Sequence, residues 1–161
     1  MTTEFRINNN KCDIMGKAFQ YIAEEGYDCV DAVRQIMTSA KLDELFAYDD
    51  CFEWVDGEQV LHNFKRHLTF KKGEPVDPYV MWFIGYLYKY WMIYEKDSRA
   101  EIYKIAPIEL LLRGFAFYHT QGWDYIISDL RLDYKRNREK NVNNSQSDSD
   151  IRKNIRDALD T

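Results

Sequence analysis

Apolar residues recur every three or four positions along most of this chain, which is the spacing of one face of an α-helix. After Ser39, for example, Leu42, Leu45 and Phe46 follow this spacing. Glycine and proline residues lie between the periodic segments and mark their ends. The pattern predicts helices over residues 14–25, 30–37, 40–54, 57–68, 78–96 and 123–137, with further helices starting after Ser98 and at Pro107. We therefore expect an all-α protein, a compact bundle of about seven or eight short helices.

The ends of these helices carry capping signals. Gly26 is a candidate C-terminal cap for the first helix. Asp28 and Asp77 are candidate N-caps, and Ser98 with Glu101 has the spacing of a capping box. These signals support the helix boundaries that the apolar spacing predicts.

The run Val80–Tyr94 is apolar on every side of a helix and rich in aromatic rings. It covers 15 residues and contains Lys89, so it is shorter than the roughly 20 apolar residues that a membrane-spanning helix needs. A helix of this kind is buried in a core or shared between subunits. We expect 78–96 to be the central core helix, with a subunit interface as the alternative. One stripe of this helix comprises Trp82, Tyr86, Tyr90 and Ile93, and another comprises Tyr79, Phe83, Leu87 and Tyr94.

Shifting the chain by 66 positions aligns the apolar residues of two segments. A period of this length exceeds that of ordinary helical solenoid repeats. It favours a duplicated helical unit, with pseudo-repeats 14–68 and 78–138 around the buried helix 78–96, although two unrelated amphipathic helix pairs can also align. The aligned pairs include Ile36 with Ile102, Leu45 with Leu111, Val60 with Ile126 and Phe64 with Leu130.

The last 21 residues differ from the rest of the chain. Residues 141–150 are polar and have nothing to bury, which predicts disorder. Ile151, Ile155 and Leu159 then follow at i, i+4 and i+8, which predicts a short amphipathic helix that docks back or binds a partner. We expect one helical domain over 1–140 and a flexible tail over 141–161, with fraying of the terminus as the alternative.

The charge is unevenly distributed. Residues 13–58 hold 12 acidic and 3 basic residues and so have a net charge of −9. The whole chain has a net charge of −5, so the remaining residues are net positive. Phosphate contacts need lysine and arginine, so this half argues against nucleic-acid binding and suits a basic protein partner. The polar start Met1–Lys11 is not a signal peptide, and the three cysteines have no paired spacing. Both features predict reduced thiols in a cytoplasmic protein with no membrane partner.

The chain shows few residues in patterns typical of catalysis. His62 and His67 are five positions apart and do not share a helix face, so they do not form a metal site. No phosphate-binding glycine loop or catalytic triad motif occurs. The acidic residues around Asp49 lack the glycine and alternation of a calcium loop. We expect no metal and no cofactor, and we interpret the acidic cluster as a solvated edge or a partner contact.

Arg113 and His119 are six positions apart near the end of a helix. This spacing resembles the arginine–histidine signature of the HEPN ribonucleases, which are all-helical domains common among bacterial toxins. The resemblance implies that the pair polarises an RNA phosphate and transfers a proton. It covers two residues, and Gly114 stands where that family commonly has a polar residue. The alternative is that both cations interact with the negative end of the helix dipole.

The stretch Tyr118–Gly122 reads Tyr-His-Thr-Gln-Gly, and Tyr125–Leu130 reads Tyr-Ile-Ile-Ser-Asp-Leu. Both resemble a group of small helical bacterial proteins that share a His-Thr-Gln-Gly turn between two helices. Members are often encoded beside ADP-ribosyltransferase-like proteins, in arrangements that look like toxin–antitoxin modules. The resemblance implies partner binding and no catalytic residues. The turn also has a structural interpretation, in which Gly122 adopts the left-handed conformation and Thr120 caps the next helix.

We therefore expect a non-enzymatic, antitoxin-like module that binds a partner protein such as a toxin encoded next to it, with a homodimer as an alternative. A HEPN-like ribonuclease using Arg113 and His119 is the second hypothesis, and a phage or mobile-element inhibitor protein is the third. The candidate partner-binding residues are Asp49, Asp50, Glu53, Tyr86, Tyr90, Tyr118, His119, Gln121 and Trp123.

Overall fold

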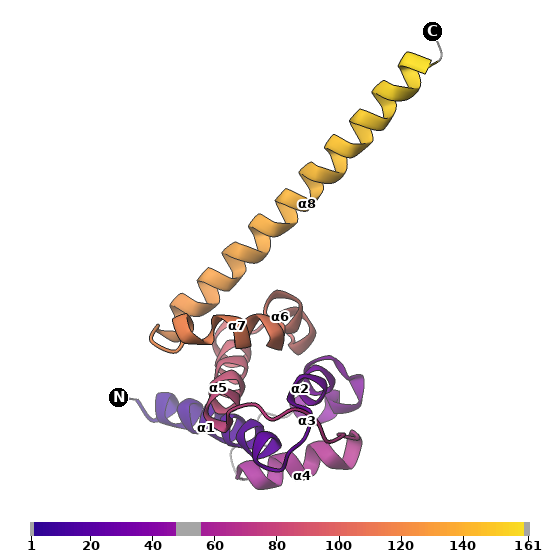
Figure 1. Ribbon diagram of the computed structural model, residues 1–161. Helices are drawn as coiled ribbons and strands as arrows, with labels where there is room; N and C mark the ends of the chain where they lie inside the picture. Colours follow the sequence, from indigo (N-terminus) through magenta and orange to yellow (C-terminus); the bar gives the residue numbers. More distant parts are fainter. Residues whose placement is uncertain (1, 48–55, 160–161) are drawn as a thin grey trace. The chain divides into compact units, whose positions relative to one another are not determined.

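The computed structural model describes residues 2–47 and 56–159, and within them the chain is all α-helical. An isolated bridge between Tyr27 and Lys72 is the one extended pairing in this part of the chain. The predicted fold class is thus confirmed (Figure 1). The helices are α1 (Thr3–Glu24), α2 (Cys29–Thr38), the short 3-10 helix η1 (Ala40–Leu42), α3 (Asp43–Ala47), α4 (Gly57–His67), α5 (Pro78–Glu95), α6 (Arg99–Ile105), α7 (Ile108–Tyr118) and α8 (Trp123–Leu159).

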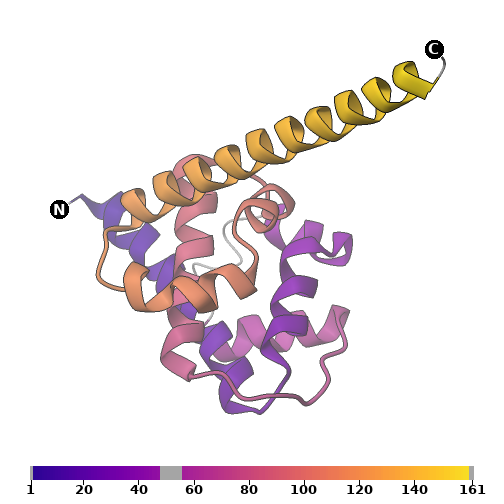
Figure 2. The ribbon, with the colours of Figure 1, turned by 45° about the horizontal axis from the view of Figure 1, so that its top comes forward.

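The chain divides into two compact units, residues 1–123 and 124–161. In the first unit α1 packs along α5 and also against α4, and both ribbon views show α1 and α5 side by side (Figures 1 and 2). This unit contains the predicted core helix α5, whose Tyr88 and Trp91 are fully buried. Other large, fully buried side chains of this core are Met15, Phe19, Ile22, Ile36, Met37, Leu42, Phe64 and Met81.

Two glycines let α1 and α5 approach closely. A Cβ atom on Gly85 of α5 would lie 2.7 Å from the carbonyl oxygen of Met15 and 3.0 Å from the Cα of Gly16 on α1. A Cβ atom on Gly16 would lie 2.7 Å from the ring of Trp82. Side chains at these positions would push the helices apart, so the pair of glycines sets the distance between them.

The predicted helix caps are observed. Gly26 follows α1 with φ of 79°, the left-handed conformation that favours glycine. Asp28 and Asp77 accept hydrogen bonds from backbone amides at the starts of α2 and α5. Ser98 and Glu101 form the complete capping box of α6. Local capping chemistry therefore fixes where these helices begin and end.

Two predicted boundaries are wrong, and a third is described only in part. The first helix begins at Thr3 instead of residue 14, with Thr2 as its N-cap. The segment after Ser39 forms η1 and α3 only as far as Ala47, beyond which it lies outside the described residues. Residues 141–150 are helical, as part of α8, instead of disordered. The stretch 123–159 contains no glycine or proline to break a helix, which explains the continuity of α8.

The helix starts bear on the predicted pseudo-repeat. Asp43 and Ile108 begin α3 and α7, which is a separation of 65 positions, and Gly57 and Trp123 begin α4 and α8, 66 positions apart. These separations match the shift that aligns the apolar residues. The duplication remains a prediction, and the division of the chain after Trp123 falls within its second copy.

Candidate functional site

Aromatic side chains form a continuous cluster along α5. We call it the aromatic ledge, and it begins with Tyr79, whose ring stacks on Trp82 at a centroid distance of 5.9 Å. Trp82 contacts Tyr86 at 5.1 Å, and the rings of Tyr90 and Tyr94 lie 4.4 Å apart. Edge-to-face, tilted and stacked ring pairs at such distances attract each other beyond their buried area. The ledge comprises Tyr79, Trp82, Tyr86, Tyr90 and Tyr94 of α5 together with Phe115, His119 and Trp123.

The last three members come from α7 and from the residues that follow it. Trp123 stacks on Tyr86 at 4.6 Å, and it also lies 6.2 Å from the ring of Tyr90. Phe115 contacts Tyr79 edge-to-face at 6.0 Å, and His119 stacks on Phe115 at 4.9 Å. The ledge thus joins side chains that lie far apart in the sequence.

Helix α1 holds two rings of the ledge by hydrogen bonds. Trp82 donates from Nε1 to the Asp13 carboxylate over 2.9 Å. Tyr86 donates from its hydroxyl to the side-chain oxygen of Asn9 over 3.3 Å. Burial raises the pKa of Tyr86 to about 12, so this hydroxyl keeps its proton at neutral pH. These bonds fix the orientation of the two rings on α5.

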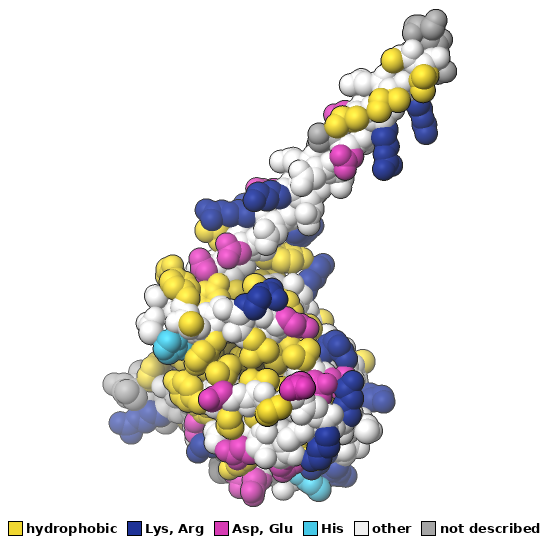
Figure 3. Space-filling model, in the orientation of Figure 1, with side chains coloured by type: hydrophobic (Ala, Val, Ile, Leu, Met, Phe, Trp, Pro, Cys, Tyr) yellow, Lys and Arg dark blue, Asp and Glu magenta, His cyan; other side chains and the backbone are white. Residues whose placement is uncertain are grey.

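The rings are open to solvent to different degrees. Tyr79 is 56% exposed and Tyr94 is 38% exposed. Trp82, Tyr86, Tyr90, Phe115 and Trp123 are half-buried, and His119 is exposed. Figure 3 shows hydrophobic side chains gathered on the face over α5 and α7. A contiguous apolar surface of this kind is typical of an interaction site.

The His-Thr-Gln-Gly turn completes α7 with its own hydrogen bonds. Nδ1 of His119 lies 2.9 Å from the carbonyl oxygen of Phe115, and Thr120 donates from its hydroxyl to the carbonyl of Phe117 over 3.1 Å. Gln121 donates from its backbone amide to the carbonyl of Tyr118. The turn places Trp123, the next residue, on the ledge.

Two expectations for this turn are wrong. Gly122 does not have a positive φ, and among the described glycines only Gly26 does. Thr120 bonds back to α7 and not forward to the amides of α8. The turn is therefore closed by side-chain bonds to the carbonyls of α7, which do not require a left-handed residue.

Four of the predicted partner-binding residues lie on the ledge, namely Tyr86, Tyr90, His119 and Trp123. Tyr118 is only 6% exposed and is therefore not available to a partner, because it packs into the first unit. Gln121 is half-buried, and its side-chain amide contacts Thr120. Asp49, Asp50 and Glu53 lie outside the described residues.

Four members of the ledge were not predicted as site residues, namely Tyr79, Trp82, Tyr94 and Phe115. A signal was present, because Trp82, Tyr86, Tyr90 and Tyr94 recur every four positions, so that each ring neighbours the next along α5. The signal was ambiguous because the other sides of this helix are apolar too. The tertiary packing resolves this ambiguity, because α1 and α7 pack against α5 and leave Tyr79 and Tyr94 exposed.

Arg113 and His119, the pair of the ribonuclease hypothesis, are both exposed near the end of α7. At about 100° per residue, six positions separate their directions by roughly 120° around the helix axis. His119 also stacks on Phe115 and bonds to its carbonyl. These contacts give His119 a structural role, and the ribonuclease hypothesis remains a prediction.

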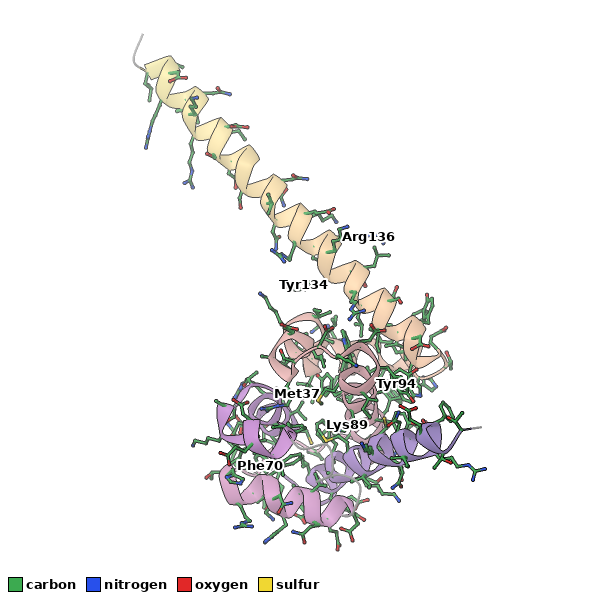
Figure 4. The ribbon with its side chains drawn as sticks, turned by 180° about the vertical axis from the view of Figure 1, so that it is seen from behind. Met37, Phe70, Lys89, Tyr94, Tyr134 and Arg136 are labelled. Atoms are coloured by element: carbon green, nitrogen blue, oxygen red, sulfur yellow. The ribbon has the colours of Figure 1, made fainter. Side chains whose placement is uncertain are left out.

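A second polar feature lies in the interior of the first unit. Arg99, which is only 9% exposed, donates to the carbonyls of Ile36 and Ser39 and to the carboxylate of Asp43. Its guanidinium lies over the ring of Phe46, 4.4 Å from the centroid. Lys89, labelled in Figure 4, is also buried. Through its hydrogen bonds and its contact with Phe46, Arg99 connects α6 to α2, η1 and α3. Its role is therefore structural.

Residues 2–47 and 56–159 hold no group of three metal-ligating side chains that could bind an ion. Cys12 and Cys29 are both buried and free, and burial raises the pKa of each thiol. Such thiols are poor nucleophiles, because the reactive thiolate is disfavoured. In the same described part of the chain no helix is long and apolar enough to cross a membrane.

Comparisons with protein-family models, with curated proteins and with solved structures gave no match for this chain.

Proposed function

We propose that this chain is a non-enzymatic protein-interaction module that binds a partner protein through the aromatic ledge. The observation that supports the proposal is the row of partly exposed rings from Tyr79 to Tyr94, in which Trp123 connects Tyr86 to Tyr90. Tyrosine and tryptophan are enriched at protein interfaces because they offer a large contact area with a polar tip.

The rigidity of the ledge favours binding. The rings pack against one another. Hydrogen bonds from Trp82 to Asp13 and from Tyr86 to Asn9 also fix two of them to α1. A surface that is already ordered loses little conformational entropy when it is covered. The resemblance of the His-Thr-Gln-Gly turn suggests that the partner is a toxin encoded beside this chain, which makes the function antitoxin-like.

The experiment is co-expression of the full chain with affinity-tagged products of the adjacent genes. The expected result is a stable complex that Tyr79→Ser weakens at least tenfold. Tyr125→Ser is the matched control, because Tyr125 is 50% exposed and Tyr79 is 56% exposed. Circular dichroism checks that both variants keep their helical content. A complex that survives Tyr79→Ser and Trp82→Ser together would contradict the role of the ledge.

The non-enzymatic part of the proposal has its own test. Purified full chain is incubated with structured and single-stranded RNA, and we expect the RNA to stay intact. Cleavage that disappears in His119→Ala, with the helical content unchanged, would overturn the proposal in favour of a ribonuclease. The variant Arg113→Gln then checks whether the second residue of that pair takes part.

A further inference from the structure

The end of α8 is a short basic amphipathic helix. Ile151, Ile155 and Leu159 are 52%, 55% and 79% exposed. They follow one another every four residues, so they form a stripe along one side of the helix. Arg152 and Arg156 each follow an isoleucine by one position and therefore flank this stripe. Lys153 adds a third cation to the segment, against a single acid, Asp157.

The aromatic ledge has the complementary character. None of its eight side chains is lysine or arginine, whereas the acids Asp77 and Glu95 are exposed at the two ends of α5. Asp13 lies beside Trp82, its side chain is 37% exposed, and it also forms an ion pair of 3.2 Å with Lys17. The faces of tyrosine and tryptophan rings attract guanidinium groups within about 6 Å. The ledge therefore suits a helix that offers aliphatic side chains and arginines together.

The aliphatic stripe is short enough to lie along the ledge. From Tyr79 to Tyr94 the ledge extends over about 22 Å, at 1.5 Å per residue. The segment Ile151–Leu159 extends over about 12 Å by the same measure. The whole aliphatic stripe thus fits along the ledge, with ring surface to spare for the arginines.

We propose that the segment Ile151–Leu159 of one molecule docks on the aromatic ledge of a second copy. Two molecules that exchange these segments reciprocally form a closed dimer with two identical contacts. The docked segment covers the surface that the proposed function assigns to the partner protein, so self-association and partner binding compete. The inference therefore rests on the ledge being a binding surface.

The test measures the mass of the full chain by light scattering and sedimentation velocity over a wide range of concentration. We expect a concentration-dependent dimer, because a contact of this size follows mass action. The variant Ile151→Ser/Ile155→Ser removes the aliphatic stripe, and Tyr79→Ser/Tyr94→Ser alters the ledge. Each double variant alone should be monomeric where the wild-type chain is dimeric.

Mixing the two double variants separates this contact from other modes of association. The stripe variant keeps an intact ledge and the ledge variant keeps an intact stripe, so the mixture regains one of the two contacts and should associate again. A ledge variant that stays dimeric alone would overturn the proposal in favour of a contact between two copies of α8. A wild-type chain that is monomeric throughout the range would overturn it as well.

Two pairs of basic residues on α8 allow a matched comparison, one pair beside the stripe and one pair far from it in the sequence. Arg152→Gln/Arg156→Gln should weaken the dimer roughly tenfold, since the guanidinium groups lose their ring and carboxylate partners. Lys135→Gln/Arg136→Gln removes two cations from a different part of α8 and should leave the dimer unchanged (Arg136, Figure 4). Equal effects of the two pairs would show a nonspecific charge effect and would contradict the docking.

The outcomes also separate this inference from the proposed function. A monomeric chain that still forms a ledge-dependent complex with a neighbouring gene product overturns only the docking of the segment. A dimer that depends on the ledge, without any complex with those products, overturns only the proposed partner.

Discussion

The indole ring of Trp123 lies on the phenol ring of Tyr86, with centroids 4.6 Å apart and ring planes 19° from parallel. Trp123 is the first residue of α8, and Tyr86 lies in the middle of α5. The turn formed by His119–Gly122 ends α7 just before this stack. The turn therefore contributes to the candidate site through the residue that it places there.

Replacement of Trp123 by alanine should lower the free energy of unfolding by about 1–2 kcal/mol. Truncation of a fully buried tryptophan costs about 3–5 kcal/mol, and Trp123 is only half-buried. Trp123→Phe keeps a ring on Tyr86 and should cost less than about 1 kcal/mol. Urea unfolding measures both, with Phe5→Ala as the control, since Phe5 is 42% exposed. Equal losses from Trp123→Ala and Trp123→Phe would mean that the stack contributes little.

The helices and their caps could be predicted from the sequence because their causes are local. The capping box of Ser98 and Glu101 and the glycine after α1 each act within a few residues. The length of α8 was missed for a related reason. The polar residues 141–150 have weak helix propensities individually, and only the lack of a breaker across the whole segment indicates a continuous helix.

The site could be predicted only in part because its members meet through tertiary packing. Tyr86 and Tyr90 were expected from the aromatic stripe of α5, and Trp123 and His119 from the turn. No local pattern shows that Trp123 stacks on Tyr86, or that Tyr118 is buried while His119 is exposed. The ring of Tyr118 lies where a side chain on Gly114 would extend, so that glycine makes room for it within the first unit.

Gly85→Ala should destabilise the protein, although alanine is the better helix former. Helix propensity alone would stabilise the variant by about 1 kcal/mol. The new Cβ atom would lie 2.7 Å from the carbonyl oxygen of Met15, and this backbone can only yield if α1 moves away from α5. Overpacking of this kind costs about 1–3 kcal/mol, which exceeds the gain in propensity, so we expect a net loss of up to about 2 kcal/mol.

The matched variant for this test is Gly122→Ala. A Cβ atom on Gly122 meets no atom within 4 Å, and Gly122 is not among the positive-φ residues. Its thermal midpoint should equal that of the wild-type chain or exceed it slightly. A Gly85→Ala variant with the same midpoint as Gly122→Ala would contradict the close approach of α1 and α5.

Arg99→Ala should be among the most destabilising single substitutions in the first unit. It removes the donor to Ile36, Ser39 and Asp43 and deprives the buried carbonyl of Ile36 of this bond, whereas the carbonyl of Ser39 still accepts from the amide of Leu42. Losses of about 3–5 kcal/mol are typical when one member of a buried charged network is removed. Burial lowers the pKa of Arg99, yet Asp43 opposes this effect, so the group stays charged at neutral pH.

The comparison for Arg99 is Asp43→Asn. The side chain of Asp43 is 70% exposed, so the ion pair itself is screened and worth at most about 1 kcal/mol. Chemical unfolding of both variants should therefore show a much larger loss for Arg99→Ala. Similar losses would mean that the ion pair, and not the bonds to the two carbonyls, holds α6 to α2 and η1.

The stability of the chain should fall as the pH rises from about 9 to 12, in part because of Cys12. Burial raises the pKa of this thiol from 9.0 to about 12 in the folded protein. In this window the unfolded thiol has lost its proton while the folded thiol keeps it, so the unfolded state binds fewer protons and the free energy of unfolding decreases with pH. A pKa difference of about 3 corresponds to about 4 kcal/mol as an upper limit. Below about pH 8 the thiol is protonated in both states and contributes no pH dependence.

Cys12→Ser isolates this contribution, because a serine hydroxyl does not ionise in the same range. Urea unfolding of the wild-type chain and of Cys12→Ser is measured at pH 8 and at pH 11. We expect the wild-type chain to lose more stability between the two values than the variant does. The variant should still lose some, because burial also raises the pKa of Tyr86 and Tyr88. Equal losses in the two proteins would show that Cys12 does not stay protonated in the folded state at alkaline pH.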